Sequence, residues 1–298
     1  MTIDRRRFVI AAAAALVSMR TQAQTPTMTD VITRPIPRGG ERLPCVGLGT
    51  AWEYDRDSDA TRSAAEAVLR ALLDAGGKVV DTASTYGDAE AILGGAIAPQ
   101  GWRERLFIAT KVEAPDDAEF HRSLERLRVR SVDLLQLHNV HDAAQSLAKF
   151  RDWKAQALCR YIGVTSTYHN DFDAVASVLS REKPDFVQID YSIDNRVAER
   201  RILPLAADTG AAVLTALPFG RARVFRAVRG KSVPDWATPF AASWAQFFLK
   251  YLLGDPRVTA VIPGTTNAAH MTDNAGAMHG RLPDAKERRR MLDYVARL

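Results

Sequence analysis

Apolar and polar positions along the chain follow two alternating patterns. Short unbroken runs rich in Val, Ile and Leu alternate with longer segments in which apolar residues recur every three or four positions. The first pattern is typical of strands covered on both faces, and the second of amphipathic helices. The predicted strands are 43–50, 78–82, 106–112, 132–138, 161–165, 186–191, 211–217 and 258–263. The clearest predicted helices are 63–76, 118–128, 171–182 and 240–254, with a last helix, 284–298, packed across the outside.

Eight strands, each followed by a helical segment, predict an α/β fold, the closed (β/α)8 TIM barrel. Segment 31–49 alternates around PRGGE, which predicts an N-terminal β-hairpin leading into the first barrel strand. The rival is an open doubly wound sheet, which usually carries a G-x-G-x-x-G turn after its first strand. Here that strand ends GLGTAWEYD, without the third glycine, so the barrel is favoured. No low-complexity linker divides 24–298, which we expect to be one domain.

The first 23 residues have the pattern of an export signal. A basic start is followed by an apolar stretch at 8–19 and by a small-residue cleavage site at Ala23. This pattern predicts a signal peptide at 1–23 that is too short to span a bilayer stably. The run Arg5-Arg6-Arg7-Phe8 resembles a twin-arginine signal, which implies the twin-arginine export machinery as partner and a periplasmic location. The alternative is a lone N-terminal anchor or a frayed basic start.

Charge and cysteines narrow the function classes. The net charge of the 298 residues is +5, but residues 1–23 hold four arginines and one aspartate, leaving 36 basic and 34 acidic side chains. With no basic stripe interleaved with aromatics, we expect no nucleic-acid binding. Cys45 and Cys159 are more easily explained as two buried thiols than as a disulfide, and no Cys/His cluster has zinc-ligand spacing. We therefore expect no bound metal. We also expect the protein to be a monomer.

Four ionisable side chains fall at the ends of three successive predicted strands. Asp81 ends 78–82 with Tyr86 just beyond, Lys111 ends 106–112, and His138 ends 132–138. The carboxyl ends of barrel strands meet at one face, so these four side chains should lie close together. Each has an ordinary explanation alone: a turn cap, a rim aromatic, a surface lysine and a core histidine. Their joint occurrence is what indicates an active site.

The four groups share a chemical task. A phenol has a pKa of about 10, which is high for a proton donor at neutral pH, and a neighbouring ammonium lowers that value. A carboxylate keeps the lysine charged, and a histidine can hydrogen-bond a carbonyl oxygen. This set suits protonation of a carbonyl group as it receives a hydride. No side chain supplies a hydride, so a nicotinamide cofactor is implied.

Over about 31–298 the sequence resembles the aldo-keto reductase family. The matching stretches are GLGTAW (47–52), DTASTYGDAEAILG (81–94), ATK (109–111), LQLHN (135–139), IGVTS (162–166), VQIDYS (187–192) and VIPGTTNAAHMTDN (261–274). The resemblance implies a catalytic tetrad of Asp81, Tyr86, Lys111 and His138. It also implies reduction of an aldehyde or ketone to an alcohol, with NADP(H) as cofactor and NAD(H) as a second candidate.

The resemblance further implies where cofactor and substrate bind. A small-molecule carbonyl substrate would meet Trp52, Tyr86 and His138. The implied cofactor site comprises Gly49, Thr50, Asp81, Thr165, Ser166, Gln188, Phe219, Gly220, Arg221, Gly264, Thr265, His270 and Asn274.

This chain departs from the family at several cofactor positions. The tyrosine that stacks on the nicotinamide corresponds to Ala216, unless Phe219 replaces it. The lysine and arginine that meet the adenosine phosphate correspond to Gly264 and His270, and the family's Ser-Asn pair to Thr165–Ser166. The loop after 211–217 is long and basic. Its cations Arg221, Arg223 and Lys231 either fold over the pyrophosphate or belong to a solvated loop.

Two other functions stay open. One is a non-catalytic NADP(H)-sensing subunit on the same barrel, against which the intact tetrad argues. The other is an isomerase or aldolase that uses Lys111 in a Schiff base and needs no nicotinamide. The rim loops carry no code that names the substrate.

Overall fold

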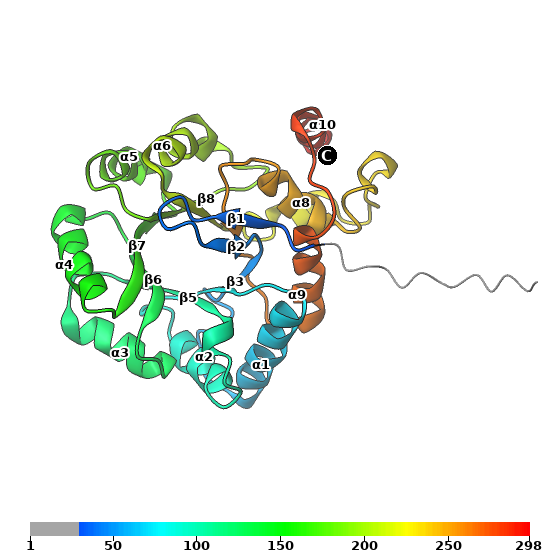
Figure 1. Ribbon diagram of the computed structural model, residues 1–298. Coiled ribbons are helices and arrows are strands. Elements are labelled where there is room, and N and C mark those ends of the chain that lie inside the picture. Colours follow the sequence, from blue (N-terminus) through cyan, green and yellow to red (C-terminus); the bar gives the residue numbers. More distant parts are fainter. Residues whose placement is uncertain (1–29) are drawn as a thin grey trace, which may run out of the picture.

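In the computed structural model, which describes residues 30–298, eight parallel strands form a barrel (Figure 1). They are β3 (Gly47–Gly49), β4 (Val79–Asp81), β5 (Phe107–Val112), β6 (Val132–Leu137), β7 (Cys159–Ser166), β8 (Phe186–Asp190), β9 (Ala212–Ala216) and β10 (Ala260–Val261). Neighbours pair in chain order, and bridges Val46–Val261 and Gly49–Gly264 join the last strand to the first. The predicted (β/α)8 barrel is confirmed. The predicted signal peptide at 1–23 lies outside the described residues.

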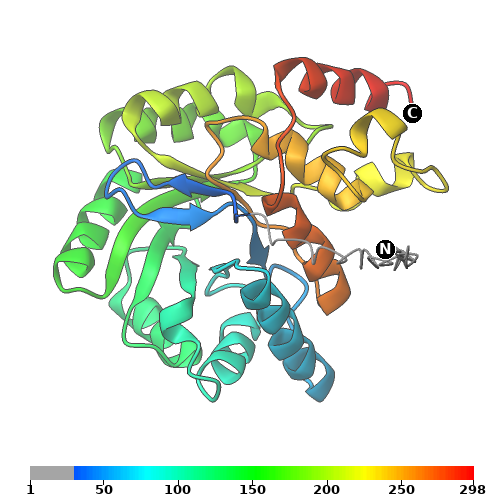
Figure 2. The same ribbon diagram turned by 45° about the vertical axis from the view of Figure 1, so that its right-hand side comes forward.

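Helices surround the barrel on its outside (Figure 1). The surrounding helices are α1 (Asp59–Asp74), α2 (Ala89–Ile97), α3 (Asp117–Leu127), α4 (Ala143–Ala155), α5 (Phe172–Arg181), α6 (Ile202–Thr209), α8 (Trp244–Leu253) and α9 (Ala268–Ala275). The short α7 (Arg223–Ala227) interrupts the long loop 217–243. The last helix, α10 (Ala285–Val295), lies outside this ring beside that loop (Figure 2).

A hairpin closes the amino-terminal end of the barrel. Strands β1 (Thr33–Pro35) and β2 (Arg42–Pro44) pair antiparallel. Ile36 and Leu43 are fully buried in the same apolar cluster as Phe107, at the start of β5. The predicted strand 43–50 is therefore two pieces, the end of the hairpin and barrel strand β3, separated at Cys45–Val46. Since one end is filled by side chains, the carboxyl ends of the strands are the open face.

Barrel closure requires a glycine at position 49. The backbone N–H of Gly49 donates to Pro263 O at 3.1 Å. A Cβ added to Gly49 would lie 2.8 Å from Ile262 O, closer than such atoms approach. The close approach of β3 and β10 brings their two following loops together at the mouth of the barrel.

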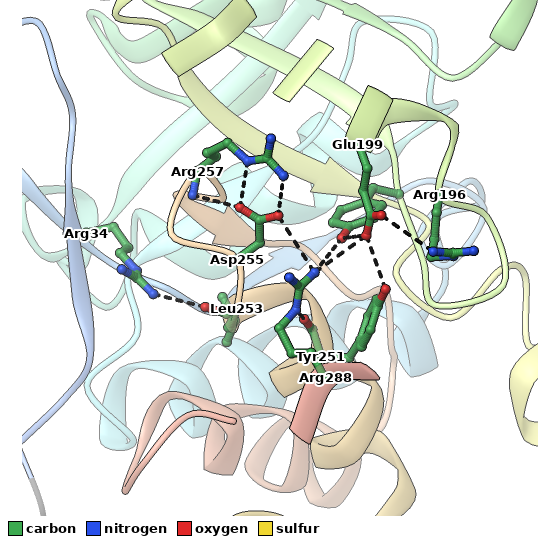
Figure 3. A network of polar contacts seen from close by, with 9 residues as sticks. Arg34, Arg196, Glu199, Tyr251, Leu253, Asp255, Arg257 and Arg288 are labelled. Atoms are coloured by element: carbon green, nitrogen blue, oxygen red, sulfur yellow. Dashed lines mark hydrogen bonds and ion pairs between the residues drawn. The ribbon is translucent and has the colours of Figure 1, made fainter. Parts of the chain in front are cut away.

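A polar network attaches α10 to the barrel (Figure 3). Arg288 of α10 donates to Tyr251 O at 2.9 Å and to the Tyr191 hydroxyl at 3.0 Å. It also forms ion pairs with Glu199 at 3.5 Å and Asp255 at 3.7 Å. Tyr191 directly follows β8, so this network links the last helix to a strand that opens onto the mouth.

The two cysteines lie in the interior of the protein. Cys45 and Cys159 are both buried and unpaired, as the sequence analysis favoured. Burial raises the pKa of each thiol to about 12.

Within residues 30–298 no helix combines the length and the apolar character needed to cross a membrane. The same residues hold no group of three or more His, Cys, Asp or Glu side chains placed to bind a metal ion.

Candidate active site

A cleft of about 1080 Å³ opens at the carboxyl ends of the barrel strands. Most of the residues that the sequence assigned to substrate or cofactor line it: Gly49, Thr50, Trp52, Asp81, Tyr86, His138, Thr165, Gln188, Phe219, Arg221, Gly264, Thr265, His270 and Asn274. Lys111 lies behind the wall, fully buried. Ser166 and Gly220 do not line the cleft.

Asp81 and Lys111 form a buried ion pair on the adjacent strands β4 and β5. Lys111 Nζ donates to Asp81 Oδ2 at 2.6 Å and to Thr82 O at 2.7 Å. Burial by itself lowers the pKa of Lys111, but the Asp81 carboxylate and the Tyr86 phenol outweigh it, so the pKa is raised. The lysine therefore stays charged inside the barrel.

Tyr86 lies above this lysine. Lys111 Nζ is 4.9 Å from the centre of the Tyr86 ring. The turn that presents the ring needs a glycine at position 87. The φ of Gly87 is +55°, and an added Cβ would lie 2.2 Å from Asp55 O. Partial burial raises the pKa of Tyr86, and the lowering effect of Lys111 does not overcome it. Sequence reasoning considered only that lowering effect. In this structure the phenol keeps its proton at neutral pH, as a proton donor must.

His138 faces Tyr86 edge-on. The two ring centres are 5.6 Å apart at an interplanar angle of 74°. Nδ1 of His138 contacts the Glu113 carboxylate and lies 3.2 Å from the Thr85 hydroxyl. Burial, followed by Lys111, lowers the pKa of His138, while Glu113 raises it. With Nδ1 engaged, Nε2 is the ring nitrogen left for a substrate oxygen.

Glu113 is a site residue that sequence reasoning missed. It follows β5 directly and lines the cleft. Its second oxygen, Oε2, accepts from the side-chain amide of Asn139 at 2.6 Å. Its position two residues after Lys111 could have marked it as a candidate. Its role was not predictable, because its partner His138 comes from the loop after β6.

Two buried amides join the tetrad to the next strands. Gln136 Nε2 donates to Gln188 Oε1 at 2.8 Å, and Gln188 Nε2 lies 3.3 Å from Asp81 Oδ2. Gln136 was hidden inside a predicted strand. Ser166, which the resemblance assigned to the carboxamide, donates instead to Asp171 Oδ2 at 2.7 Å.

The basic loop contributes one cation to the cleft. The guanidinium of Arg221 stacks on the Trp52 ring at 4.4 Å. Arg223 forms an ion pair with Asp194 at 3.0 Å. The backbone oxygen of Lys231 accepts from the Trp244 indole at 2.7 Å.

Aromatic side chains surround Ala216 in the cleft wall. Ala216, Phe219, Phe225 and Trp244 all line the cleft, and the rings of Phe219 and Phe225 are 4.8 Å apart. Aromatic surface is therefore present even though position 216 itself carries no ring.

Residues 45–289 match the model of the aldo/keto reductase family. That match covers most of the chain, and it agrees with the barrel and with the side chains at its mouth. The chain belongs to the aldo/keto reductase family. It is therefore an oxidoreductase that acts on carbonyl groups.

Two relatives in the family match the chain over different lengths. The methylglyoxal reductase YeaE of Escherichia coli is 28% identical over 261 residues, which span 83% of this chain and 90% of that protein. An aldo-keto reductase of Mycolicibacterium smegmatis is 33% identical over 175 residues, which span 54% of this chain and 58% of that one.

Solved structures show the same likeness. An aldo-keto reductase from Klebsiella pneumoniae in complex with NADPH has a TM-score of 0.76 and 25% identity, over 89% of this chain and 95% of its own. Another from the same organism, in complex with NADP and acetate, has a TM-score of 0.74 and 26% identity, over 86% and 93%.

The cleft of this aldo/keto reductase has room and polar groups for a dinucleotide. Asn274 of α9 lines the cleft and is 3% exposed. A side-chain amide that borders the cleft can both donate to and accept from a bound ligand. Thr165 also lines the cleft, at 2% exposure, and offers a hydroxyl. These residues fit a nicotinamide dinucleotide.

Proposed function

We propose that this chain reduces an aldehyde or ketone to an alcohol, with Tyr86 as proton donor and a nicotinamide dinucleotide as cofactor. The observation that carries the proposal is the Tyr86 ring above a buried Lys111–Asp81 pair, with His138 edge-on at the same cleft. The similar structures from Klebsiella pneumoniae, which are complexes with NADPH and with NADP, support a cofactor of this class.

The side chains divide the work. When bound, the nicotinamide would supply the hydride. Tyr86 gives its proton to the carbonyl oxygen and becomes a phenolate, which the buried Lys111 ammonium stabilises at 4.9 Å from the ring centre. His138, when its ring is protonated, orients the carbonyl oxygen by donating from Nε2. Asp81 keeps Lys111 charged and in place through the 2.6 Å contact.

The proposed substrates are small carbonyl compounds. Support comes from the E. coli relative, which is named a methylglyoxal reductase. The test incubates purified protein with methylglyoxal and NADH or NADPH, and follows loss of the reduced cofactor together with formation of the alcohol. Binding of dinucleotide without turnover of this or any simple aldehyde would instead favour the sensing subunit.

The alternative hypothesis, an isomerase or aldolase that forms a Schiff base at Lys111, has less support than carbonyl reduction. A Schiff base needs an exposed, neutral amine, whereas Lys111 is fully buried and its pKa is raised. Borohydride should therefore trap no carbonyl compound on Lys111, as mass spectrometry of the treated protein would show.

We also propose that the protein is exported to the periplasm through a twin-arginine signal at 1–23. Support comes from the sequence run Arg5-Arg6-Arg7-Phe8 and the apolar stretch after it. Twin-arginine transport reads the guanidinium pair, so changing Arg5 and Arg6 to Lys should leave full-length protein in the cytoplasm. Fractionation of cells expressing both forms tests this, and normal export of the double-Lys variant would refute it.

A further inference from the structure

Glu53 occupies a defined place at one end of the cleft. A Cβ added to Gly264 would lie 3.3 Å from Glu53 Cγ and 3.9 Å from Glu53 Oε1, so the carboxylate lies over that glycine. Its loop is held there by the next residue. Tyr54 is fully buried, and its hydroxyl donates to Thr265 O at 2.8 Å. This bond ties the loop after β3 to the loop after β10.

Among residues 30–298, no neighbouring cation pairs with this carboxylate. Partial burial raises the pKa of Glu53, and no positive group is close enough to oppose that effect. Of the lysines and arginines in the described chain, Arg221 alone lines the cleft, and its guanidinium is stacked on Trp52. When ionised, the Glu53 carboxylate therefore gives this end of the cleft a negative charge that no Lys or Arg of the described residues offsets.

The adenosine half of a dinucleotide belongs at this end. The nicotinamide has to lie beside Tyr86 and His138, after β4 and β6, for the carbonyl to meet the proton donor. The other half then extends toward α9, where the Asn274 side chain lines the cleft. The adenosine ribose would lie near Gly264 and Glu53, between the tetrad and α9.

We propose that Glu53 makes this enzyme prefer NAD(H) to NADP(H). The carboxylate accepts a hydrogen bond from the ribose 2′-hydroxyl of NAD(H), as acidic residues do in other dinucleotide sites. It repels the 2′-phosphate of NADP(H). The proposal rests on the proposed function, because it assumes that the cleft holds a nicotinamide dinucleotide.

Isothermal titration with NAD⁺ and with NADP⁺ tests the proposal without turnover. The wild-type protein should bind NAD⁺ more tightly. Glu53→Gln keeps the side-chain size and removes the charge, and should change the ratio of the two Kd values about tenfold in favour of NADP⁺. Glu53→Lys should reverse the preference. Glu104→Gln is the matched control, because Glu104 is exposed in the turn before β5, outside the cleft lining, and its loss changes the net charge equally.

Tighter binding of NADP⁺ by the wild-type protein would overturn the proposal, as would a Kd ratio that Glu53→Gln leaves unchanged. In both cases the proposed carbonyl reduction would stand. If neither dinucleotide binds, the proposed function and this inference fail together.

Discussion

The contact between Glu113 and His138 sets which nitrogen of the imidazole can act. A carboxylate at Nδ1 holds a proton on that nitrogen. In the neutral ring Nε2 is then an acceptor, and only the protonated ring donates from Nε2 to a carbonyl oxygen. His138 faces Lys111, Asp81, Glu113 and Tyr86, and the net effect on its pKa is a lowering. Carbonyl reduction should therefore accelerate as pH falls toward the His138 pKa.

Replacing Glu113 with Gln should move this acidic limb to still lower pH. Glu113 raises the His138 pKa, so removing its charge lets burial and Lys111 lower that pKa further. The measurements are kcat/KM against pH and an NMR titration of His138. The Glu104→Gln variant should leave both curves where they are in wild type. An unmoved or upward-shifted His138 titration in Glu113→Gln would contradict the assigned role.

The candidate site shows which residues a sequence can reveal. Asp81, Lys111 and His138 were predictable because strand ends converge in a barrel, whatever the packing details. Glu113, Gln136 and the Glu53–Gly264 contact were not, because each depends on a partner from another strand or loop. The direction of the Tyr86 pKa also depends on burial, which the strand pattern does not show.

At the scale of elements, helix starts followed local capping more closely than apolar periodicity. The segment predicted as 63–76 begins at Asp59, because Ser58 and Thr61 form a capping box. The segment predicted as 240–254 begins at Trp244, because the Ser243 hydroxyl accepts from Gln246 N at 3.1 Å. Both serines were visible in the sequence. The attachment of α10 through Arg288 was not, since its partners come from three distant segments.

Arg288→Met should destabilise the fold by about 2–3 kcal/mol, because it removes a donor from buried partners. Asp255 would keep its pair with Arg257 at 2.6 Å, but the Tyr251 carbonyl oxygen would lose its 2.9 Å donor. Urea unfolding measures the change. Arg289→Met, an exposed neighbour on α10, should change stability by less than about 0.5 kcal/mol. Equal stability of the two variants would show that the network contributes nothing.

At the scale of the whole molecule, the two ends of the barrel have different tasks. The amino-terminal end is filled by the hairpin and apolar side chains such as Leu43 and Phe107. The carboxyl end carries the cleft and the buried Lys111–Asp81 ion pair. This division was predictable from the count of strands and helices, because the active site of a (β/α)8 barrel forms from the loops that follow the carboxyl ends of its strands. The proposed cofactor preference depends on Glu53, which lies in one of the loops at this carboxyl end.

The most direct test of the account compares two variants that each remove one phenolic oxygen from the cleft. Tyr86→Phe should lower kcat for methylglyoxal by about 10²- to 10⁴-fold, the usual contribution of a general acid, and leave the dinucleotide Kd near the wild-type value. Tyr168→Phe changes a more exposed ring of the same cleft and should retain kcat within a few-fold. A Tyr86→Phe enzyme that turns over like wild type would contradict the central claim that Tyr86 is the proton donor.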